Sequence, residues 1–425
     1  MRRFIPKKLL AWYHLAFAYG GALFYRFPSR KLFVVAITGT KGKSTTCELV
    51  RTILTEAGHK VALASTIRFA IGEDSHPNLF KMTMPGHAYL QQFLRKAVDA
   101  GATHAVIEMT SEGARQYRHR GIELDALIFT NLQPEHLESH GGIENYAAAK
   151  LSLARALEHS RKRPRYVIAN ADDTYGEQFL AAEVEAKVPF SLADAEPYTA
   201  DDQSIRFVWR RGELFTVPLP GLFNLKNTLA ALALGEAMGV SRLIMKHALE
   251  HVSPVLGRAE RVERGQKFAV IIDYAHTPDS LRALLETYHP KNKLVCVMGS
   301  TGGGRDQWKR PQMGAIADEL CEVTIIANED PYDEDPRGIV EAIAKGFKKH
   351  EPRIVLDRRA AIGAALKEAR ALEGAGGDQG VAVLITGKGT DPFIMGPHGS
   401  KMPWSDRKIA EEELDKLLAE SAPAR

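Results

Sequence analysis

The stretch LFVVAITGTKGKSTTCELVRTILTEA, residues 32–57, joins a continuous apolar run, a glycine-containing turn and a helical segment. The run over 32–37 predicts a strand that is buried on both faces, as in a parallel sheet. The segment from Ser44 to about Ala57 predicts the helix that follows. A strand that leads through a short turn into a helix is the repeating unit of α/β proteins. The stretch therefore predicts an α/β fold.

The turn within this stretch has the composition of a phosphate-binding loop. Its two glycines let the backbone close around phosphate oxygens, and the helix N-terminus presents free N–H groups to an anion. Lys43 supplies positive charge, and the Ser44 hydroxyl is placed to bind Mg²⁺. The usual pattern has glycine where Ile37 stands, so the loop is a shortened one. We predict phosphate contacts from Gly39, Thr40, Lys41, Gly42, Lys43, Ser44 and Thr45.

The strand–helix alternation continues along the chain in two series. Further strands of the first series are predicted over 61–65, 105–109, 124–130 and 166–169, with an antiparallel excursion over 201–218. The second series is predicted over 268–272, 294–298, 323–327, 354–356 and 381–385. We therefore expect a central parallel-sheet domain of the P-loop ATPase type over 32–257. A Rossmann-like α/β domain is expected over 258–425, after an apolar helix within 1–31.

Composition and charge exclude several classes of protein. The chain has 425 residues, of which 45% are hydrophobic and 25% charged, so a disordered or collagen-like chain is excluded. Its three cysteines, Cys47, Cys296 and Cys321, lack metal-ligand spacing and favour a reduced, cytoplasmic protein. Residues 1–31 hold seven basic residues and no acid, so the rest of a chain of net charge +4 sums to −3. This balance argues against a nucleic-acid partner.

The N-terminal segment is apolar and aromatic between basic flanks. Its run LLAWYHLAFAYGGALFY, residues 9–25, is shorter than the roughly 20 residues of a spanning helix and lacks a signal-peptide cleavage site. One interpretation is a helix over residues 4–27 in the headgroup region of an anionic membrane, at the inner face. The other is a helix packed against the body of the protein or a partner chain. The sequence leaves both open.

Five motifs occur in an order that resembles the Mur ligases. They are GTKGKST (39–45), FTNLQPEHLESHG (129–141), YAAAK (146–150), GLFNLKNTLAA (221–231) and DYAHTPD (273–279). The segments GRAERV (257–262), GGGRDQWKRPQMG (302–314) and GKG (387–389) are similar to the branch that adds the third stem-peptide residue, the UDP-N-acetylmuramoyl-tripeptide synthetases. The resemblance implies an ATP-dependent, ADP-forming ligase of peptidoglycan synthesis. Such an enzyme activates a muropeptide carboxylate as an acyl phosphate, which an amino acid then attacks.

The resemblance also assigns roles to residues of this chain. Catalytic positions are Lys43, Glu108, His136 and Lys150, of which Lys150 matches a lysine that the family carbamylates. Mg²⁺ would be held by Ser44, Glu108 and His136. ATP contacts beyond the phosphate loop are expected from Asn227, Arg258, Asp273 and His276. The muropeptide acceptor would meet Thr83, Thr110, Gln116 and Arg118, and the incoming amino acid Arg305, Glu329, Asp330, Gly387 and Asp391.

The chain departs from the family pattern at several positions. Where the family has two consecutive threonines, this chain has Thr83-Met84. Glu112 adds a negative charge beside the acceptor positions. The Asp-Asn-Pro-Arg motif of diaminopimelate-adding enzymes reads EDPY (329–332), and Tyr332 cannot offer a guanidinium to a distal carboxylate. The acidic residues nearby predict an amino acid with a distal ammonium, such as lysine or ornithine. Because only 31 residues precede the first strand, we expect the family's UDP-binding domain to be absent and consider a lipid-linked acceptor.

Two other functions fit parts of the pattern. One is a related ATP-dependent amino acid ligase, such as folylpolyglutamate synthase. The other is a non-catalytic nucleotide-binding scaffold at the membrane, which would need none of Lys43, Glu108, His136 and Lys150. The leading hypothesis is a monomeric muropeptide ligase. The sequence leaves open which amino acid is added and whether the acceptor carries UDP or a lipid.

Overall fold

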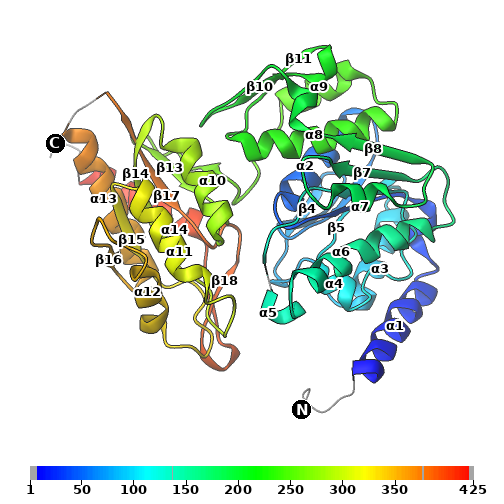
Figure 1. Ribbon diagram of the computed structural model, residues 1–425, viewed down its shortest axis with the longest axis horizontal. Helices are drawn as coiled ribbons and strands as arrows, with labels where there is room; N and C mark the ends of the chain where they lie inside the picture. The colour runs from blue at the N-terminus through cyan, green and yellow to red at the C-terminus, as the bar shows by residue number, and fades with distance from the viewer. Residues whose placement is uncertain (1–6, 136, 376–377, 421–425) are drawn as a thin grey trace. The chain divides into compact units, whose positions relative to one another are not determined.

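The computed structural model describes residues 7–135, 137–375 and 378–420, which form two compact units (Figure 1). The first unit holds the chain up to Thr199 together with Ile205–Pro218 and Phe223–Val252. The second holds Ser253 onward together with two short segments, Ala200–Ser204 and Leu219–Leu222. Both units are mixed α/β structures with parallel sheets, which confirms the predicted fold class.

The first unit is built on an eight-stranded sheet in the order β4-β3-β2-β5-β1-β6-β7-β8. Six strands are parallel, and β3 and β4 run antiparallel at one edge. The strands are β1 (Phe33–Thr38), β2 (Val61–Ala64), β3 (Arg68–Ile71), β4 (Asp74–Pro77), β5 (His104–Glu108), β6 (Ala126–Phe129), β7 (Tyr166–Asn170) and β8 (Ala186–Phe190). A separate antiparallel sheet of β9 (Tyr198–Ala200), β10 (Ile205–Val208) and β11 (Leu214–Val217) follows, as the alternation over 201–218 predicts.

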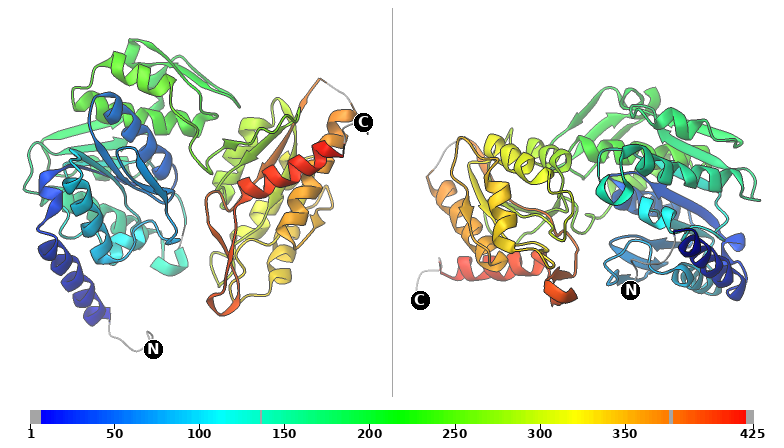
Figure 2. Two further views of the ribbon diagram at one scale, coloured as in Figure 1. Left: turned by 180° about the vertical axis from the view of Figure 1, so that it is seen from behind. Right: turned by 60° about the horizontal axis from the view of Figure 1, so that its bottom comes forward.

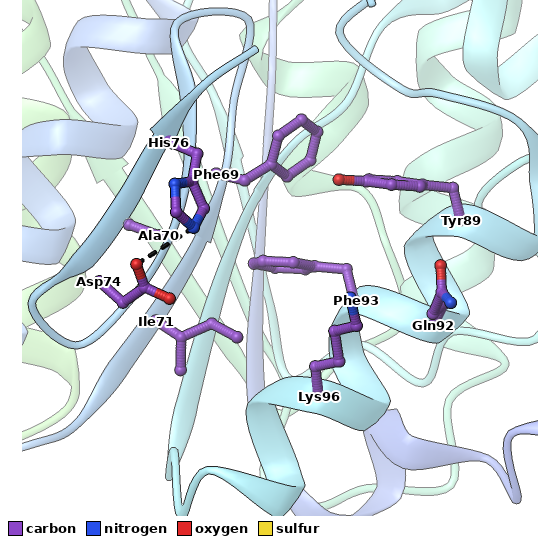
Figure 3. A pocket seen from close by; sticks show the side chains of 9 residues that line it. All are labelled: Phe69, Ala70, Ile71, Asp74, His76, Tyr89, Gln92, Phe93 and Lys96. Carbon is purple, nitrogen blue, oxygen red and sulfur yellow. Dashed lines mark ion pairs between the residues drawn. The ribbon is translucent and has the colours of Figure 1, made fainter. Parts of the chain in front are cut away.

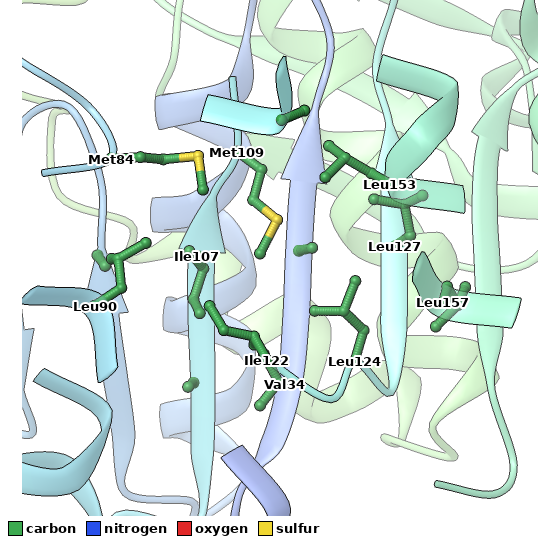
Figure 4. Packing of buried hydrophobic residues seen from close by; sticks show 14 of the residues in the cluster. Val34, Met84, Leu90, Ile107, Met109, Ile122, Leu124, Leu127, Leu153 and Leu157 are labelled. Carbon is green, nitrogen blue, oxygen red and sulfur yellow. The ribbon is translucent and has the colours of Figure 1, made fainter. Parts of the chain in front are cut away.

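Helices bury both faces of the large sheet. One face packs on a core that includes Val34, Ile107, Leu127 and Leu157 (Figure 4). The helices of this unit are α1 (Lys7–Phe24), α2 (Lys43–Glu56), α3 (His87–Asp99), α4 (Ser111–Arg115), α5 (Leu137–His140), α6 (Ile143–Glu158), α7 (Gly176–Leu180), α8 (Leu222–Ala237) and α9 (Arg242–Glu250). Because buried parallel strands are apolar throughout, β1 reads as the continuous run that the sequence shows.

Helix α1 lies along the outer edge of the first unit, as both views of Figure 2 show. It contacts α3, and Ala18 and Ala22 are fully buried in this contact, while Trp12 remains 72% exposed. A 3₁₀ turn, η2 (Pro28–Lys31), links it to β1. Within the described chain, no helix is long and apolar enough to cross a bilayer.

The second unit contains a six-stranded sheet in the order β12-β13-β17-β14-β15-β16. Its strands are β12 (Glu260–Arg261), β13 (Ala269–Ile272), β14 (Asn292–Met298), β15 (Val323–Ile326), β16 (Arg353–Ile354) and β17 (Gly380–Ile385), and only β12 is antiparallel to its neighbour. Its helices are α10 (Pro278–Tyr288), α11 (Lys309–Leu320), α12 (Pro336–Ala344), α13 (Arg358–Gly374) and α14 (Asp406–Ala419). A hairpin of β18 (Phe393–Met395) and β19 (Lys401–Pro403) precedes α14.

Candidate active site

The phosphate loop connects β1 to α2, as predicted. Gly39 and Gly42 adopt positive φ angles of 150° and 80°, a backbone conformation that favours glycine. There is also no room for larger residues: a Cβ on Gly39 would lie 2.0 Å from Thr130 Oγ1, and one on Gly42 would lie 2.0 Å from Asn227 Oδ1. Asn227, predicted to contact ATP, therefore packs directly against the loop. Gly42 caps α2, so the N–H groups of the first turn are oriented for an anion.

Four cationic and hydroxyl side chains of the loop are paired or buried. Lys41 Nζ pairs with Glu135 Oε1 at 2.9 Å, and Lys43 Nζ donates to Thr40 O at 2.8 Å. Thr40 Oγ1 lies 3.1 Å from Tyr146 OH, and Thr45 is buried in the first turn of α2. The loop is thus held in shape by contacts with the segment after β6 and with α6.

Glu108 is the centre of a buried hydrogen-bond network at the end of β5. Ser44 Oγ donates to Glu108 Oε2 at 2.9 Å, which brings together two of the three predicted metal ligands. Thr66 donates twice, from its backbone N to Oε2 at 2.8 Å and from its hydroxyl to Oε1 at 2.9 Å. The Thr66 hydroxyl lies 2.7 Å from that of Thr83, a predicted acceptor contact. The chain of contacts therefore runs from the phosphate loop to the acceptor side.

The oxygens of Ser44 and Glu108 suit Mg²⁺, which prefers hard oxygen ligands. Glu108 is 2% exposed, so its charge lies in a region of low dielectric where it would interact strongly with a cation. His136, the third predicted ligand, lies outside the described residues. Among the described residues, no three His, Cys, Asp or Glu side chains converge as a complete metal site.

Lys150 is buried beneath the phosphate loop. It projects from α6, is 1% exposed, and donates from Nζ to Gly39 O at 2.6 Å. Its Nζ lies 4.6 Å from the centre of the Tyr146 ring. Burial lowers the pKa of Lys150 well below its ordinary value, and the charge of Lys43 lowers this pKa further. A larger fraction of the amine is therefore neutral, and therefore nucleophilic, than in an exposed lysine.

The predicted acceptor residues lie near one another around α4. Thr110 caps this helix by accepting from Gly113 N at 3.1 Å, and its own N–H donates to Met84 Sδ at 3.4 Å. Arg118 Nη2 donates to Gln116 Oε1 at 2.5 Å, and Nη1 donates to the Met84 carbonyl. Met84, which replaces a family threonine, therefore fills the centre of this group of side chains.

Glu112 is neutralised locally. Its carboxylate pairs with Arg115 at 2.9 Å and accepts from Gln116 Nε2 at 2.6 Å. Its side chain is 44% exposed. The additional negative charge that the sequence places beside the acceptor is therefore balanced by a neighbour on the same helix.

In the second unit, the predicted nucleotide-contacting residues surround the end of β13. Asp273 accepts from Ala259 N and Ala275 N, both at 2.6 Å, and so joins the segment before β12 to the turn after β13. The Arg258 guanidinium lies 4.5 Å from the Tyr274 ring centre. Lys309 Nζ donates to His276 O at 2.8 Å. The motif DYAHTPD therefore forms an ordered turn at a strand end, where open α/β sheets bind their ligands.

The predicted amino-acid residues also come together within the second unit. Lys388, which the sequence analysis did not single out, is 0% exposed and pairs with Asp330 at 2.9 Å and Asp391 at 3.3 Å. Burial alone would lower the pKa of Lys388, but the carboxylates of Asp330 and Asp391 raise it. Arg305 lies over the Tyr332 ring at 5.1 Å. Of the three acids predicted to contact the amino acid, Asp330 and Asp391 are therefore already paired with Lys388.

Glu329 is the exception among these acids. It is 2% exposed, and its Oε1 accepts from Thr301 Oγ1 at 2.8 Å, while Oε2 has no hydrogen-bond partner among the described residues. A Cβ at Gly387 would lie 2.2 Å from this Oε2, so glycine at 387 leaves room for it. Burial and the neighbouring Asp330 raise the pKa of Glu329. A cation placed beside Oε2 would satisfy this carboxylate.

A pocket of about 140 Å³ opens between the β3–β4 hairpin and α3 (Figure 3). Aromatic rings form much of its wall, and His76 pairs with Asp74 at 3.1 Å on one side. It is lined by Phe69, Ala70, Ile71, Asp74, His76, Tyr89, Gln92, Phe93 and Lys96. None of the predicted site residues lines it.

Comparison with known proteins shows to which family the chain belongs. Residues 37–235 match the model of the Mur ligase middle domain, and residues 257–389 match that of the Mur ligase glutamate ligase domain. The UDP-N-acetylmuramoyl-L-alanyl-D-glutamate–2,6-diaminopimelate ligase of Syntrophomonas wolfei is 34% identical over 412 residues, covering 94% of this chain and 81% of that protein. The UDP-N-acetylmuramyl-tripeptide synthetase of a Roseiflexus species is 35% identical over 424 residues, covering 93% and 81%.

A solved structure is similar to most of the chain. It is that of a UDP-N-acetylmuramoyl-L-alanyl-D-glutamate–2,6-diaminopimelate ligase, which is 26% identical, has a TM-score of 0.61, and matches over 95% of this chain and 83% of that one. The family resemblance inferred from the motifs is thereby confirmed. The chain belongs to the Mur ligase family, whose members are ATP-dependent ligases that add amino acids to peptidoglycan precursors.

Proposed function

We propose that this protein uses ATP and Mg²⁺ to join an amino acid to the carboxylate of a muropeptide. The network from Ser44 through Glu108 and Thr66 to Thr83 carries the proposal, because it links the phosphate loop to the acceptor positions through direct hydrogen bonds. Such a network would place the acceptor carboxylate beside the terminal phosphate of ATP, which is what formation of an acyl phosphate requires. The proposed site of action is the cytoplasm.

Ser44, Glu108 and His136 would hold the Mg²⁺ ion. The ion would screen the negative charges of the phosphates and the acceptor carboxylate. Lys41 and Lys43 would add positive charge from the loop, and the remaining loop residues would bind phosphate oxygens through their backbone N–H groups. We propose further nucleotide contacts by Asn227, Arg258, Asp273 and His276.

We propose that Lys150 is carbamylated. The reaction requires a neutral amine, since the Nζ lone pair attacks the carbon of CO₂ and a proton leaves the nitrogen. The lowered pKa of Lys150 supplies that form of the amine. The product is an anion, which in this position would be surrounded by the cations of the phosphate loop.

For the incoming amino acid we propose a substrate with a distal ammonium, such as lysine or ornithine. Glu329 supports this choice because its Oε2 has no hydrogen-bond partner among the described residues, whereas Lys388 already pairs with Asp330 and Asp391. Tyr332 stands where a diaminopimelate-adding enzyme offers arginine. Arg305 and the backbone at Gly387 would contact the α-carboxylate and the side-chain stem.

The experiment is ATP-dependent phosphate release with UDP-N-acetylmuramoyl-L-Ala-D-Glu and a panel of amino acids that includes lysine, ornithine and meso-diaminopimelate. Release that requires one amino acid, and that falls at least about 100-fold in Lys150→Ala, is expected. Bicarbonate-free buffer should lower the activity reversibly if Lys150 is carbamylated. In Glu329→Gln the KM for the preferred amino acid should rise while the KM for ATP is unchanged. Faster turnover with diaminopimelate than with lysine would contradict the specificity.

We also propose that the protein is a monomer that contacts the inner face of the membrane through residues 4–27. The exposed aromatic side chains of α1 support this peripheral contact. Centrifugation with and without membranes from the expressing cells measures it directly.

A further inference from the structure

The two faces of α1 differ in their surroundings although both are apolar. Ala18 and Ala22 are buried, and a Cβ on Gly21 would lie 3.2 Å from the Ala88 backbone of α3. The helix therefore rests on the body through its smallest side chains. The opposite face carries its large ones, which are 49% to 78% exposed: Trp12, Tyr13, Phe17, Tyr19, Leu23 and Phe24.

This outer face is too apolar to be an ordinary solvated helix surface. Soluble proteins rarely leave a contiguous aromatic and aliphatic patch open to water unless it binds something. The patch contains a tryptophan and two tyrosines, residues that are enriched where an apolar region meets a polar one. No residue between Lys8 and Arg26 is charged. The exposed residues of this face are thus uncharged, and basic residues flank the run in the sequence.

A second basic segment contacts the chain that follows α1. The run RKRPR, residues 161–165, is distant in sequence but contacts the chain just after α1. Lys162 Nζ donates to the Leu32 carbonyl, and Arg161 N donates to Glu123 Oε2 at 2.9 Å. The same Glu123 pairs with Arg30 at 3.5 Å. The two basic segments therefore meet around one carboxylate.

The charge balance of this region favours an anionic partner. Three of its acids are already paired: Glu123 with Arg30, Asp125 with Lys162, and Glu185 with Arg163 and Arg165. Arg26, Lys31 and Arg161 are exposed, and none has a carboxylate partner among the described residues. The sequence has no Asp or Glu before Glu48. Arg26 and Lys31 follow α1 in the chain, and Arg161 belongs to the segment that shares Glu123 with Arg30.

We infer that α1 and the basic residues Arg26, Lys31 and Arg161 together form a docking surface for an anionic lipid bilayer. The inference rests on the proposed peripheral contact and specifies its chemistry. The outer face of α1 would enter the headgroup region, and the three cations would bind lipid phosphates at its edge. Charge complementarity selects a lipid surface, since a purely apolar partner would leave the cations without counter-charge. Helix α1 would lie in the plane of the interface because its inner face is held by α3.

The test is co-sedimentation of the full chain with vesicles of phosphatidylcholine alone and of phosphatidylcholine with 30% phosphatidylglycerol. Strong binding is expected only to the anionic vesicles, with a loss at high salt. Trp12→Ser/Phe17→Ser/Phe24→Ser should abolish it, whereas the control Leu214→Ser/Leu243→Ser, which changes exposed leucines elsewhere, should bind as wild type. Arg26→Gln/Lys31→Gln/Arg161→Gln should weaken binding roughly 100-fold, at about fivefold per charge. The control Arg337→Gln/Lys408→Gln, which removes two exposed charges elsewhere, should bind as wild type.

Phosphate release with a water-soluble acceptor is measured on the same proteins and should be unchanged in every variant. This separates failure of the docking surface from failure of the ligase proposal. Equal binding to both vesicle types, or wild-type binding by the triple basic variant, would overturn the inference. A dimer in light scattering that the triple aromatic variant dissociates would instead assign the face to a second copy of the chain.

Discussion

Ser44 Oγ and Glu108 Oε2 lie 2.9 Å apart, so the first turn of α2 and the end of β5 meet at one carboxylate oxygen. Glu108→Gln keeps the shape of the side chain and removes its charge. We expect at least a 100-fold fall in kcat, because the proposed Mg²⁺ site would lose the negative charge of Glu108. Phosphate release titrated with Mg²⁺ measures this. An unchanged Mg²⁺ dependence would contradict the assignment.

Gly42→Ala should inactivate the phosphate loop. An alanine there must adopt a φ of about 80° and must also displace Asn227, whose Oδ1 would lie 2.0 Å from the new Cβ. Gly239→Ala is the matched control, since Gly239 has a φ of 78° and nothing within 4 Å of its added Cβ. Both variants should lose about 1–2 kcal/mol of stability from the backbone conformation, but only Gly42→Ala should lose nucleotide binding. Thermal unfolding with and without ATP distinguishes the two.

His119 should make the protein sensitive to mild acid. It is 2% exposed, neither ring nitrogen has a hydrogen-bond partner among the described residues, and burial lowers its pKa to about 3. In the unfolded chain His119 is protonated below about pH 6.5, whereas in the folded chain it stays neutral until the pH approaches 3. The free energy of unfolding is therefore undiminished above pH 6.5 and decreases as the pH falls toward 3. Between pH 6.5 and 5 the loss is about 2 kcal/mol.

The variant that tests this is His119→Leu. Urea unfolding at pH 7 and pH 5 should show a smaller difference in the free energy of unfolding than in the wild type. An identical pH dependence in the two proteins would show that His119 is not the titrating group.

Asp406→Ala should destabilise the second unit strongly. Arg358 and Asp406 are 1% and 0% exposed and form two hydrogen bonds of 2.8 and 2.7 Å. Removing the carboxylate leaves a buried guanidinium without its counter-charge, at a cost of about 3–5 kcal/mol. Asp415→Ala, which breaks an exposed pair with Arg264, should unfold within error of the wild type. Denaturant unfolding of the full chain measures both.

The sequence predicted the buried strands better than the edges of the sheet. Strands such as β1 and β17 are parallel and buried on both faces, so they appear as continuous apolar runs. Strand β4, with the sequence DSHP, is fully exposed, and β8 contains Pro189 and alternates in burial. Neither is a continuous apolar run, because edge strands need not be buried on both faces.

Features of the site that depend on adjacent residues can be predicted from the sequence, whereas features that depend on distant partners cannot. The loop around Lys43 is encoded by adjacent residues, and so it is readable in sequence. The roles of Thr66 and Lys388 depend on partners such as Glu108 and Asp330, which are 42 and 58 positions away along the chain. Nothing in the local pattern shows that Lys388 neutralises Asp330, although its motif GKG was noted. The position of Met84 beside Thr110 is likewise a product of the tertiary fold.

The close packing of α1 on the body of the first unit imposes different limits on substitution at its two faces. Any side chain larger than a methyl group at Ala22 would meet the turn at Gly121, whose own added Cβ would lie 2.7 Å from the Ala22 Cβ. Trp12 and Phe24 meet no such barrier. Substitution is therefore limited by the size of the side chain on the inner face of the helix, but not on the outer face. The exposed face can accept larger or polar side chains, while the inner face accepts only small ones.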